Sequence, residues 1–255
     1  MPERALDAAP AQDAPQPEVR AFVYDALWGM PSGGPFSLKL LTWLRMAGIE
    51  HAITVDNDAR NGPKQKNPWV AIDGELVGDT EIIAWRLSER LGIDLDASLS
   101  ARERAVALAF RRLIDEHLHQ VVTHTHFVSD RGWSVHGQAI VGTIEAPGFL
   151  KGFIGSMIRR GITKAAWVRG MSRHDDATID RMGSDDLRAL SAQLGEAPFL
   201  MGEQPTTVDA SFYAFLAFVL QVPIDGPMRQ LAQATPNLVA YHQRMTERFF
   251  PELAS

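Results

Sequence analysis

The stretch Thr206–Val222, TTVDASFYAFLAFVLQV, combines a helix-start signal with a strongly apolar run. The Thr206 hydroxyl can accept a hydrogen bond from the Asp209 amide, and the Asp209 carboxylate can accept one from the Thr206 amide. Such a reciprocal pair is a capping box, and its carboxylate suits the positive end of a helix. The apolar residues that follow predict a central, buried helix. Thr206 and Asp209 are therefore interpreted as structural residues that stabilise the fold and indicate no substrate.

Residues 19–92 carry strand and helix signals that predict a small α/β domain. Strands are expected at residues 20–26 and 51–56, and as a hairpin around Asp73–Gly74. One helix is expected from residue 35 to a stop at Gly48, and another from its N-cap Thr80 to Gly92. The order strand-helix-strand-loop-strand-strand-helix is that of thioredoxin-like domains.

From Ala101 onward the sequence predicts helices and no strand. A long amphipathic helix is expected over residues 101–128 and a loop with short helical turns over 129–150. Further helices are expected over residues 153–168, 184–195, 206–222 and 236–250. With a linker at 93–100, the chain is predicted to be an α+β protein with an all-helical second domain, residues 101–255. Residues 1–18, rich in Ala and Pro, are expected to be a disordered tail.

Composition excludes several classes of function. The 255-residue chain has a net charge of −6 and no cysteine. An acidic chain lacks the basic footprint of a nucleic-acid binder. The absence of cysteine excludes disulfides, thiolate metal sites and cysteine nucleophiles. The tail matches no targeting pattern, and the longest apolar run, residues 210–224, falls short of the about 20 residues that span a bilayer. We therefore expect a cytoplasmic protein with no transmembrane segment.

Two stretches carry a family resemblance. PFLMGEQPTTVDASFYAFLAF, residues 198–218, resembles the C-terminal domain of glutathione S-transferases. The longer stretch, residues 169–209, is similar to the failed-axon-connections and metaxin-like branch, as are PFSLKLLTWLRMAGIEH and NPWVAIDGELVGDTEII. The matching positions in 169–209 are Arg173, His174, Asp186, Leu187, Ala189, Leu190 and Ser191. The resemblance implies a two-domain glutathione-transferase fold, a thioredoxin-like domain that binds glutathione, and a homodimer.

The resemblance also implies where glutathione binds. Asn67 and Pro68 match the position at which a cis-Pro exposes a backbone edge for the cysteinyl amide. From the residues alone, an ordinary trans Pro at a strand start is the simpler interpretation. Asp79 and Thr80 match the acid–hydroxyl pair that holds the γ-glutamyl end, where helix amides suit a carboxylate. Helix capping by Thr80 is the alternative, and the two roles are compatible.

Activation of the ligand thiol is the point at which the sequence departs from the pattern. Gly34, which the resemblance also makes a candidate glutathione-binding residue, occupies the position that commonly holds Ser or Cys. Ser37, expected in the first helical turn, and Ser32, in the preceding loop, are equal candidates for the catalytic hydroxyl, ahead of Tyr24. A capping or packing role is the alternative for each. The helix amides alone can lower a thiol pKa.

The second substrate is expected between the domains. The first long helix of the second domain faces the cleft in transferases of this shape, so Glu116, His119 and Thr123, with Trp28, are the candidate pocket residues. The histidines from His117 to His126 contain no pair with the i, i+4 spacing of helical metal ligands, and no metal site is predicted. The basic segment 159–173 is interpreted as a solvated face, with an anionic lipid surface as the alternative.

Two functions follow from these expectations. The first is a glutathione-dependent enzyme, with glutathione as cosubstrate, that transfers the thiolate to a small apolar electrophile. The alternative is a non-catalytic binding or interaction protein with the transferase fold, which Gly34 and the basic segment favour.

Overall fold

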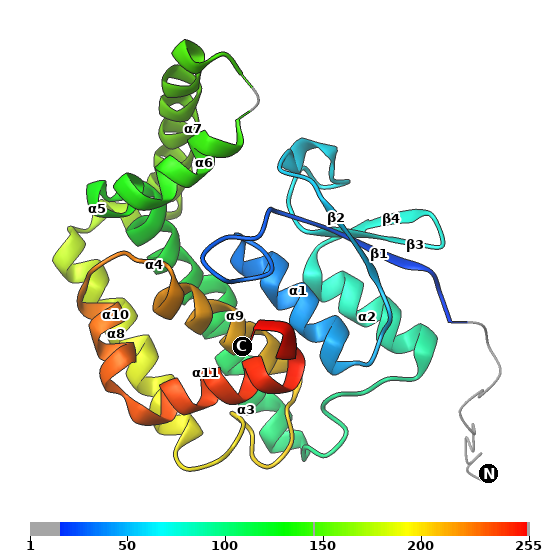
Figure 1. The fold of residues 1–255 in the computed structure, drawn as a ribbon. Coiled ribbons are helices and arrows are strands. Elements are labelled where there is room, and N and C mark those ends of the chain that lie inside the picture. The colour runs from blue at the N-terminus through cyan, green and yellow to red at the C-terminus, as the bar shows by residue number, and fades with distance from the viewer. Residues whose placement is uncertain (1–15, 145, 254–255) are drawn as a thin grey trace, which may run out of the picture.

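The structure is a computed structural model that describes residues 16–144 and 146–253, so the expected disordered tail lies largely outside the described residues. The N-terminal part contains a mixed sheet of four strands in the order β2-β1-β3-β4. Two helices, α1 and α2, lie on the same side of this sheet (Figure 1). The elements are β1 (Val19–Val23), α1 (Pro35–Met46), β2 (Ala52–Val55), the short 3-10 helix η1 (Ala59–Asn61), β3 (Trp69–Ile72), β4 (Glu75–Gly78) and α2 (Thr80–Leu91).

The pairing within the sheet is that of the predicted thioredoxin-like order. Strand β1 is parallel to β2 and antiparallel to β3, and β3 is antiparallel to β4. Asp73 and Gly74 have φ of 49° and 86°, the left-handed values of a tight hairpin turn. Alternate residues of β1, namely Val19, Ala21 and Val23, are buried. The predicted hairpin and element order are confirmed.

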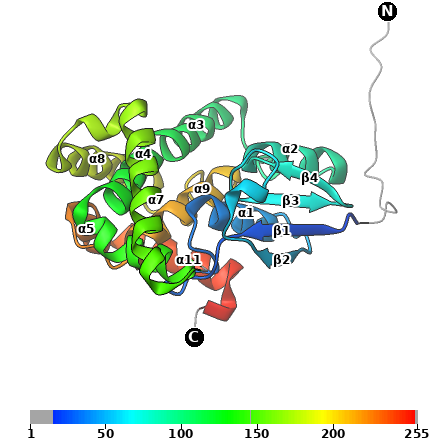
Figure 2. The same ribbon diagram turned by 90° about the horizontal axis from the view of Figure 1, so that it is seen from above.

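The second part of the chain is helical, and it lies beside the sheet and its helices (Figure 2). Its longer helices are α3 (Ala101–Arg112), α7 (Gly148–Arg169), α8 (Asp176–Leu194), α9 (Thr207–Gln221), α10 (Pro227–Ala234) and α11 (Pro236–Phe249). Between α3 and α7 lie η2 (Leu113–Leu118), α4 (His119–Thr123), η3 (His124–Val128), α5 (Asp130–Gly132), η4 (Trp133–Gly137) and α6 (Gln138–Thr143). The 3-10 helices η5 (Met171–Arg173) and η6 (Pro251–Leu253) complete the set.

Several sequence-based boundaries in this part are wrong. The helix expected over residues 101–128 is interrupted by two π-helical segments, η2 and η3. Most of the loop expected over 129–150 is helical, through α5, η4 and α6. Helices α7 and α8 begin earlier than expected, and α10 was not anticipated.

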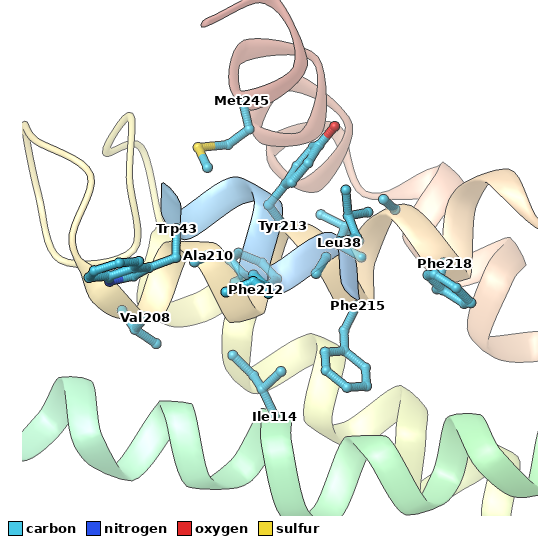
Figure 3. Close-up of a cluster of buried hydrophobic side chains, with 14 of the residues drawn as sticks. Leu38, Trp43, Ile114, Val208, Ala210, Phe212, Tyr213, Phe215, Phe218 and Met245 are labelled. Carbon is cyan, nitrogen blue, oxygen red and sulfur yellow. The ribbon is translucent and has the colours of Figure 1, made fainter. Parts of the chain in front are cut away.

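Helix α9 is the centre of the core. Its residues from Val208 to Val219 are all buried. Figure 3 shows that Leu38 of α1, Ile114 of η2 and Met245 of α11 approach α9 from different sides. A helix that is apolar all round requires such enclosure, because every face must be removed from water. Helix α9 therefore joins the helical part to the α/β part through α1.

The capping box at the start of α9 is confirmed. The fully buried Asp209 carboxylate accepts hydrogen bonds from the amide and hydroxyl of Thr206 at 2.8 and 3.0 Å. It also accepts the Leu200 amide at 2.9 Å and the Tyr241 hydroxyl at 3.0 Å. These bonds tie the loop before α9 and helix α11 to one carboxylate.

Within the described residues, no helix combines the length and apolar character needed to cross a membrane.

Candidate functional site

Two adjoining cavities lie where α1 and the loops of the sheet face the helices. The more polar of the two, called the polar cavity, has a volume of about 460 Å³, and the other, called the apolar cavity, has a volume of about 360 Å³. The two cavities share five lining residues: Phe36, Asn67, His119, Thr123 and Ile162. A ligand in the polar cavity can therefore reach a second molecule in the apolar one.

Four of the residues expected to hold glutathione meet in the polar cavity, whereas the fifth, Gly34, lines the apolar one. Asn67, Pro68, Asp79 and Thr80 all line the polar cavity. The Asn67–Pro68 peptide bond is cis, as the resemblance implied. The Asn67 side chain is held by two hydrogen bonds, because it donates to the Asp56 carbonyl at 3.1 Å and accepts from the Ser37 hydroxyl at 2.5 Å.

The cap of α2 differs by one residue from the prediction. Asp79, not Thr80, is the N-cap, and its carboxylate accepts from the amides of Glu81 and Ile82 at 3.0 and 3.5 Å. Asp79 has a φ of 86°, which non-glycine residues adopt rarely and mostly at functional or tightly constrained positions. Because Asp79 caps the helix, the Thr80 hydroxyl is not required for that task.

Three cations in the polar cavity were not anticipated. Lys64 and Lys66 come from the loop before the cis-Pro, and Arg169 comes from the end of α7. Among the described residues, these three form no ion pair. The sequence Pro63–Pro68, PKQKNP, shows two of the cations beside the proline, and Arg169 lies too far along the chain to be linked with them by pattern.

Two further cations of this cavity are paired across the two parts of the molecule. Lys39 of α1 contacts Asp115 of η2, with Nζ 2.6 Å from Oδ2, and both side chains are buried. Arg112 of α3 donates two bonds to Glu81 of α2, at 2.8 and 2.9 Å. Burial would raise the pKa of Glu81, but the hydrogen bond from Arg112 and the charges of Arg111 and Arg112 lower it. The two ion pairs connect α1 to η2 and α2 to α3 across the polar cavity.

Gly34 lies at the N-terminal end of α1, against Tyr24. A Cβ atom added to Gly34 would lie 2.6 Å from Cδ2 of Tyr24 and 3.1 Å from the Ser37 hydroxyl oxygen. Both distances are too short for a side chain to fit without movement of its neighbours. The tyrosine ring therefore occupies the space that the side chain of a Ser or Cys at this position would need.

The three candidate hydroxyls occupy different environments. Ser37 lines the apolar cavity, and its hydroxyl donates to Asn67. Ser32 is fully buried, donates to the Tyr24 carbonyl at 2.9 Å and lines neither cavity, so the structure does not bring it to the site. Tyr24 lines the apolar cavity, and burial, with the charges of Asp58 and Asp56, raises its pKa. Tyr24 is therefore a neutral hydrogen-bond donor.

The residues expected to contact the second substrate lie in different places: three line one or both cavities, and Trp28 lines neither. Glu116 lines the polar cavity, whereas His119 and Thr123 line both. Burial, with the charges of Arg169 and Lys66, lowers the pKa of His119 to about 4, so its imidazole is neutral at physiological pH. Trp28 lines neither cavity and instead packs edge-on against His136, a residue of the apolar cavity, with ring centroids 4.6 Å apart.

Four other histidines of the helical part have partners of their own. His117 contacts Asp186 at 2.7 Å, and His124 contacts Asp176 at 2.8 Å. The Nδ1 atoms of His126 and His136 lie 3.3 Å apart, and burial lowers the pKa of both. Across residues 16–144 and 146–253, no group of three or more His, Asp or Glu side chains is arranged to hold a metal ion.

Comparison with known families matches both parts of the chain. Residues 35–132 match the model of the glutathione S-transferase N-terminal domain, and residues 183–245 match that of the glutathione S-transferase C-terminal domain.

Individual relatives extend over nearly the whole chain. The isoprene-epoxide–glutathione S-transferase of Rhodococcus sp. (strain AD45) is 31% identical over 91% of this chain and 99% of its own length. Failed axon connections of Drosophila melanogaster is 30% identical and human metaxin-1 is 28% identical, over 88% and 90% of this chain. The chain spans 56% and 51% of the length of these last two proteins.

Solved structures show the same fold. Glutathione transferase F7 from Populus trichocarpa has a TM-score of 0.60 at 12% identity, covering 92% of this chain and 97% of its own. A rice transferase in complex with glutathione has a TM-score of 0.55 at 14% identity, covering 91% and 88%. The chain therefore belongs to the glutathione S-transferase family, in the branch that contains failed axon connections and metaxin-1.

Proposed function

We propose that this protein is a glutathione-dependent transferase, with glutathione in the polar cavity and an apolar electrophile in the adjoining cavity. The observation that carries the proposal is the meeting of Asn67, Asp79 and Thr80 in one cavity that shares a wall with a second, more apolar one. Family membership supports the same assignment.

Charge complementarity supports glutathione as the occupant. Glutathione carries two carboxylates and one ammonium group. The polar cavity presents Lys64, Lys66 and Arg169 to the carboxylates and the Asp79 and Glu116 carboxylates to the ammonium. In the proposed arrangement the γ-glutamyl end binds at Asp79 and Thr80, and the cysteinyl backbone binds beside Asn67. Charge-assisted hydrogen bonds of this kind are stronger than neutral ones.

The thiol then lies near the N-terminus of α1. The partial positive charge of the helix end favours the thiolate. In the proposed arrangement the hydroxyl of Tyr24, which lines the adjoining apolar cavity, donates a hydrogen bond to the sulfur. Ser37 can do so only if its hydroxyl turns away from Asn67. The thiol proton is released to solvent, the sulfur forms a bond to the electrophilic carbon, and the electrophile loses a leaving group or opens a ring.

The apolar cavity favours a small, weakly polar electrophile. Its wall includes Leu27, Ile140 and Ile158, with the neutral imidazole of His119 among them. One relative is named for an isoprene epoxide, which makes a small alkyl epoxide a suitable second test substrate. An opened epoxide places a negative charge on oxygen, which takes up a proton from solvent.

A non-catalytic binding protein is the second candidate. Gly34 has no side chain to offer the sulfur, and the Ser37 hydroxyl is hydrogen bonded to Asn67. A site of this kind can hold glutathione without activating it. The homodimeric state and the cytoplasmic location expected from the sequence stay predictions for either function.

Turnover distinguishes the two candidates. Glutathione is incubated with a generic aromatic electrophile, 1-chloro-2,4-dinitrobenzene, and with a small alkyl epoxide, and conjugates are measured against the reaction without protein. The enzyme is expected to form product faster than the background reaction. Thr80→Val should reduce kcat/KM, whereas Thr207→Val, at the corresponding first position of α9, should not. Binding of glutathione with no turnover of either electrophile would favour the non-catalytic protein.

A further inference from the structure

Helix α7 has two unlike faces. Its inner face, with Ile158, Ile162 and Arg169, lines the two cavities. Its outer face is exposed, and α7 rises with α6 beyond the rest of the molecule (Figure 1). The outer face has no role in the two-cavity site.

The outer face of α7 is unusually apolar for an exposed surface. The exposed fractions are 84% for Phe149, 64% for Phe153, 55% for Met157, 55% for Trp167 and 68% for Val168. Phe149, Phe153 and Met157 are each four residues apart, and Trp167 follows Met157 by ten residues, so helical periodicity places them along one side of the helix. Large apolar side chains gathered on one side of an exposed helix indicate an interaction surface rather than ordinary scatter. We call this side of α7 the apolar strip.

The charge of α7 is opposite to that of the protein. The 22-residue helix contains five basic residues and no Asp or Glu, in a chain with a net charge of −6. Arg160 and Lys164 continue the apolar strip between Met157 and Trp167, and both are exposed. In the described part of the chain, neither of them forms an ion pair. The face therefore combines aromatic groups with cations that are available to a partner.

A groove of about 610 Å³ lies alongside this strip. Trp133 and Trp167 contribute to its wall, together with Arg160, Lys164 and the hydroxyl of Thr163. Arg159 also lines it but is already bonded to Asp130 and the Val128 carbonyl, both at 2.7 Å. Two cations, a hydroxyl and indole rings are groups that suit a phosphate with an attached acyl chain.

We propose that the outer face of α7 binds the surface of a bilayer that contains anionic phospholipids. Arg160 and Lys164 contact the lipid phosphates, and Phe149, Phe153 and Met157 enter the boundary between headgroups and acyl chains. Basic amphipathic helices with aromatic residues bind membranes in this orientation. A second copy of the chain is a poorer partner, because pairing two such helices brings their cations together with no carboxylate on either.

Lipid binding by this surface does not depend on the proposed transferase function. It would, however, bring the apolar cavity of the proposed transferase close to a membrane. Because one helix forms both the lipid-facing strip and the cavity wall, the apolar cavity lies close to the membrane when α7 is bound. That link, unlike lipid binding itself, rests on the proposed function. An apolar electrophile dissolved in the bilayer would then have a short path to the site.

Vesicle sedimentation tests the proposal. The full chain is mixed with vesicles of phosphatidylcholine alone or of equimolar phosphatidylcholine and phosphatidylglycerol. It should sediment with the anionic vesicles only, and salt should release it. The double variant Arg160→Gln/Lys164→Gln should bind about thirty-fold more weakly, at about 1 kcal/mol for each basic residue near an anionic surface. Phe149→Ser/Phe153→Ser should also weaken binding.

The matched control removes two exposed cations elsewhere. Arg102→Gln/Arg181→Gln changes the net charge equally, on α3 and α8, and should leave vesicle binding unchanged. Equal binding to both vesicle types, or equal loss in the control, would overturn the proposal. Release of the protein by millimolar inorganic phosphate would instead identify a free-phosphate site. Concentration-dependent dimers that the α7 variants dissociate would identify an interface between copies. Unchanged glutathione titrations for the variants would separate this test from that of the transferase function.

Discussion

Gly34 and Tyr24 are in such close contact that a Cβ atom on residue 34 would lie 2.6 Å from Cδ2 of the tyrosine ring. The conformation of Gly34, with φ of −120°, is open to any residue, so the constraint is the ring and not the backbone. Packing against Tyr24 thus explains the glycine at the position that commonly holds Ser or Cys.

This contact predicts that a side chain at residue 34 is costly. Gly34→Ser should lower the free energy of unfolding by about 1–3 kcal/mol, the usual cost of overpacking. Tyr24→Ala should relieve most of that cost, so the double variant should lose less than the sum of the single variants. Urea unfolding of the four proteins measures the coupling. Additive losses would mean that the ring does not exclude the side chain.

Asp79 is the N-cap of α2 and Thr80 is not, so variants of these two residues can separate effects on stability from effects on glutathione binding. Asn is as good an N-cap as Asp, so Asp79→Asn should leave the free energy of unfolding nearly unchanged. The same change removes the carboxylate proposed to pair with the ligand ammonium, and glutathione affinity should fall about tenfold or more, the value of a hydrogen bond to a charged group. Thermal unfolding and calorimetry measure the two effects. Unchanged affinity would contradict the role of Asp79.

Thr80→Val probes the other half of the pair. Its hydroxyl is not the cap, so the valine variant should keep its thermal stability within about 0.5 kcal/mol, as surface changes usually do. Glutathione affinity should nevertheless fall by about tenfold or more for loss of a bond to the charged γ-glutamyl end. Thr207→Val is the control. Equal affinity in both variants would show that the γ-glutamyl end binds elsewhere.

The buried Lys39–Asp115 pair joins α1 to η2 with side chains 9% and 8% exposed. Removing one partner leaves an uncompensated buried charge, so Lys39→Met should cost about 3–5 kcal/mol of unfolding free energy. Replacing both with apolar residues, Lys39→Met/Asp115→Leu, should recover much of this loss. Denaturant unfolding measures the difference. A double variant no more stable than Lys39→Met would mean that the pair itself is not the source of the cost.

Three buried or partly buried histidines predict a loss of stability in mild acid. Burial lowers the pKa of His242 to about 4, from an ordinary value of 6.5, and those of His119 and His136 likewise. The unfolded chain takes up these protons first, so stability is complete above about pH 6.5 and falls as the pH decreases toward 4. Each of these histidines contributes at most about 3 kcal/mol to the pH-dependent part of the free energy of unfolding. His242→Gln, remote from both cavities, should flatten the slope of unfolding free energy against pH. An unchanged slope would contradict the lowered pKa.

The parts of the site that are local in sequence could be predicted, and the parts assembled from distant segments could not. Asn67–Pro68 and Asp79–Thr80 are adjacent pairs at element boundaries, and both line the polar cavity. Arg169 reaches the same cavity from α7, and nothing in its neighbourhood indicates this. Ser32 and Ser37 looked equivalent from the sequence, and only the folded loop buries the first one against the Tyr24 carbonyl.

The segment after η3 is helical where the sequence predicts a loop, because its glycines have a packing role. A Cβ on Gly132 would lie 1.9 Å from the Thr125 carbonyl oxygen, and one on Gly137 would lie 2.5 Å from the Trp133 indole. These glycines permit close contact within helical segments, whereas glycine-rich sequence usually indicates a loop. Helix α10 is only eight residues long, which leaves little periodicity to detect.

Calorimetric titration of the full chain with reduced glutathione tests the central assignment most directly. Saturable binding at one site per chain is expected, weakened by Asp79→Asn and Thr80→Val and retained by Thr207→Val. The dipeptide Cys-Gly, which lacks the γ-glutamyl arm, should bind much more weakly to the unaltered protein. No heat of binding at millimolar glutathione, or equal affinity for Cys-Gly, would contradict the assignment of the polar cavity.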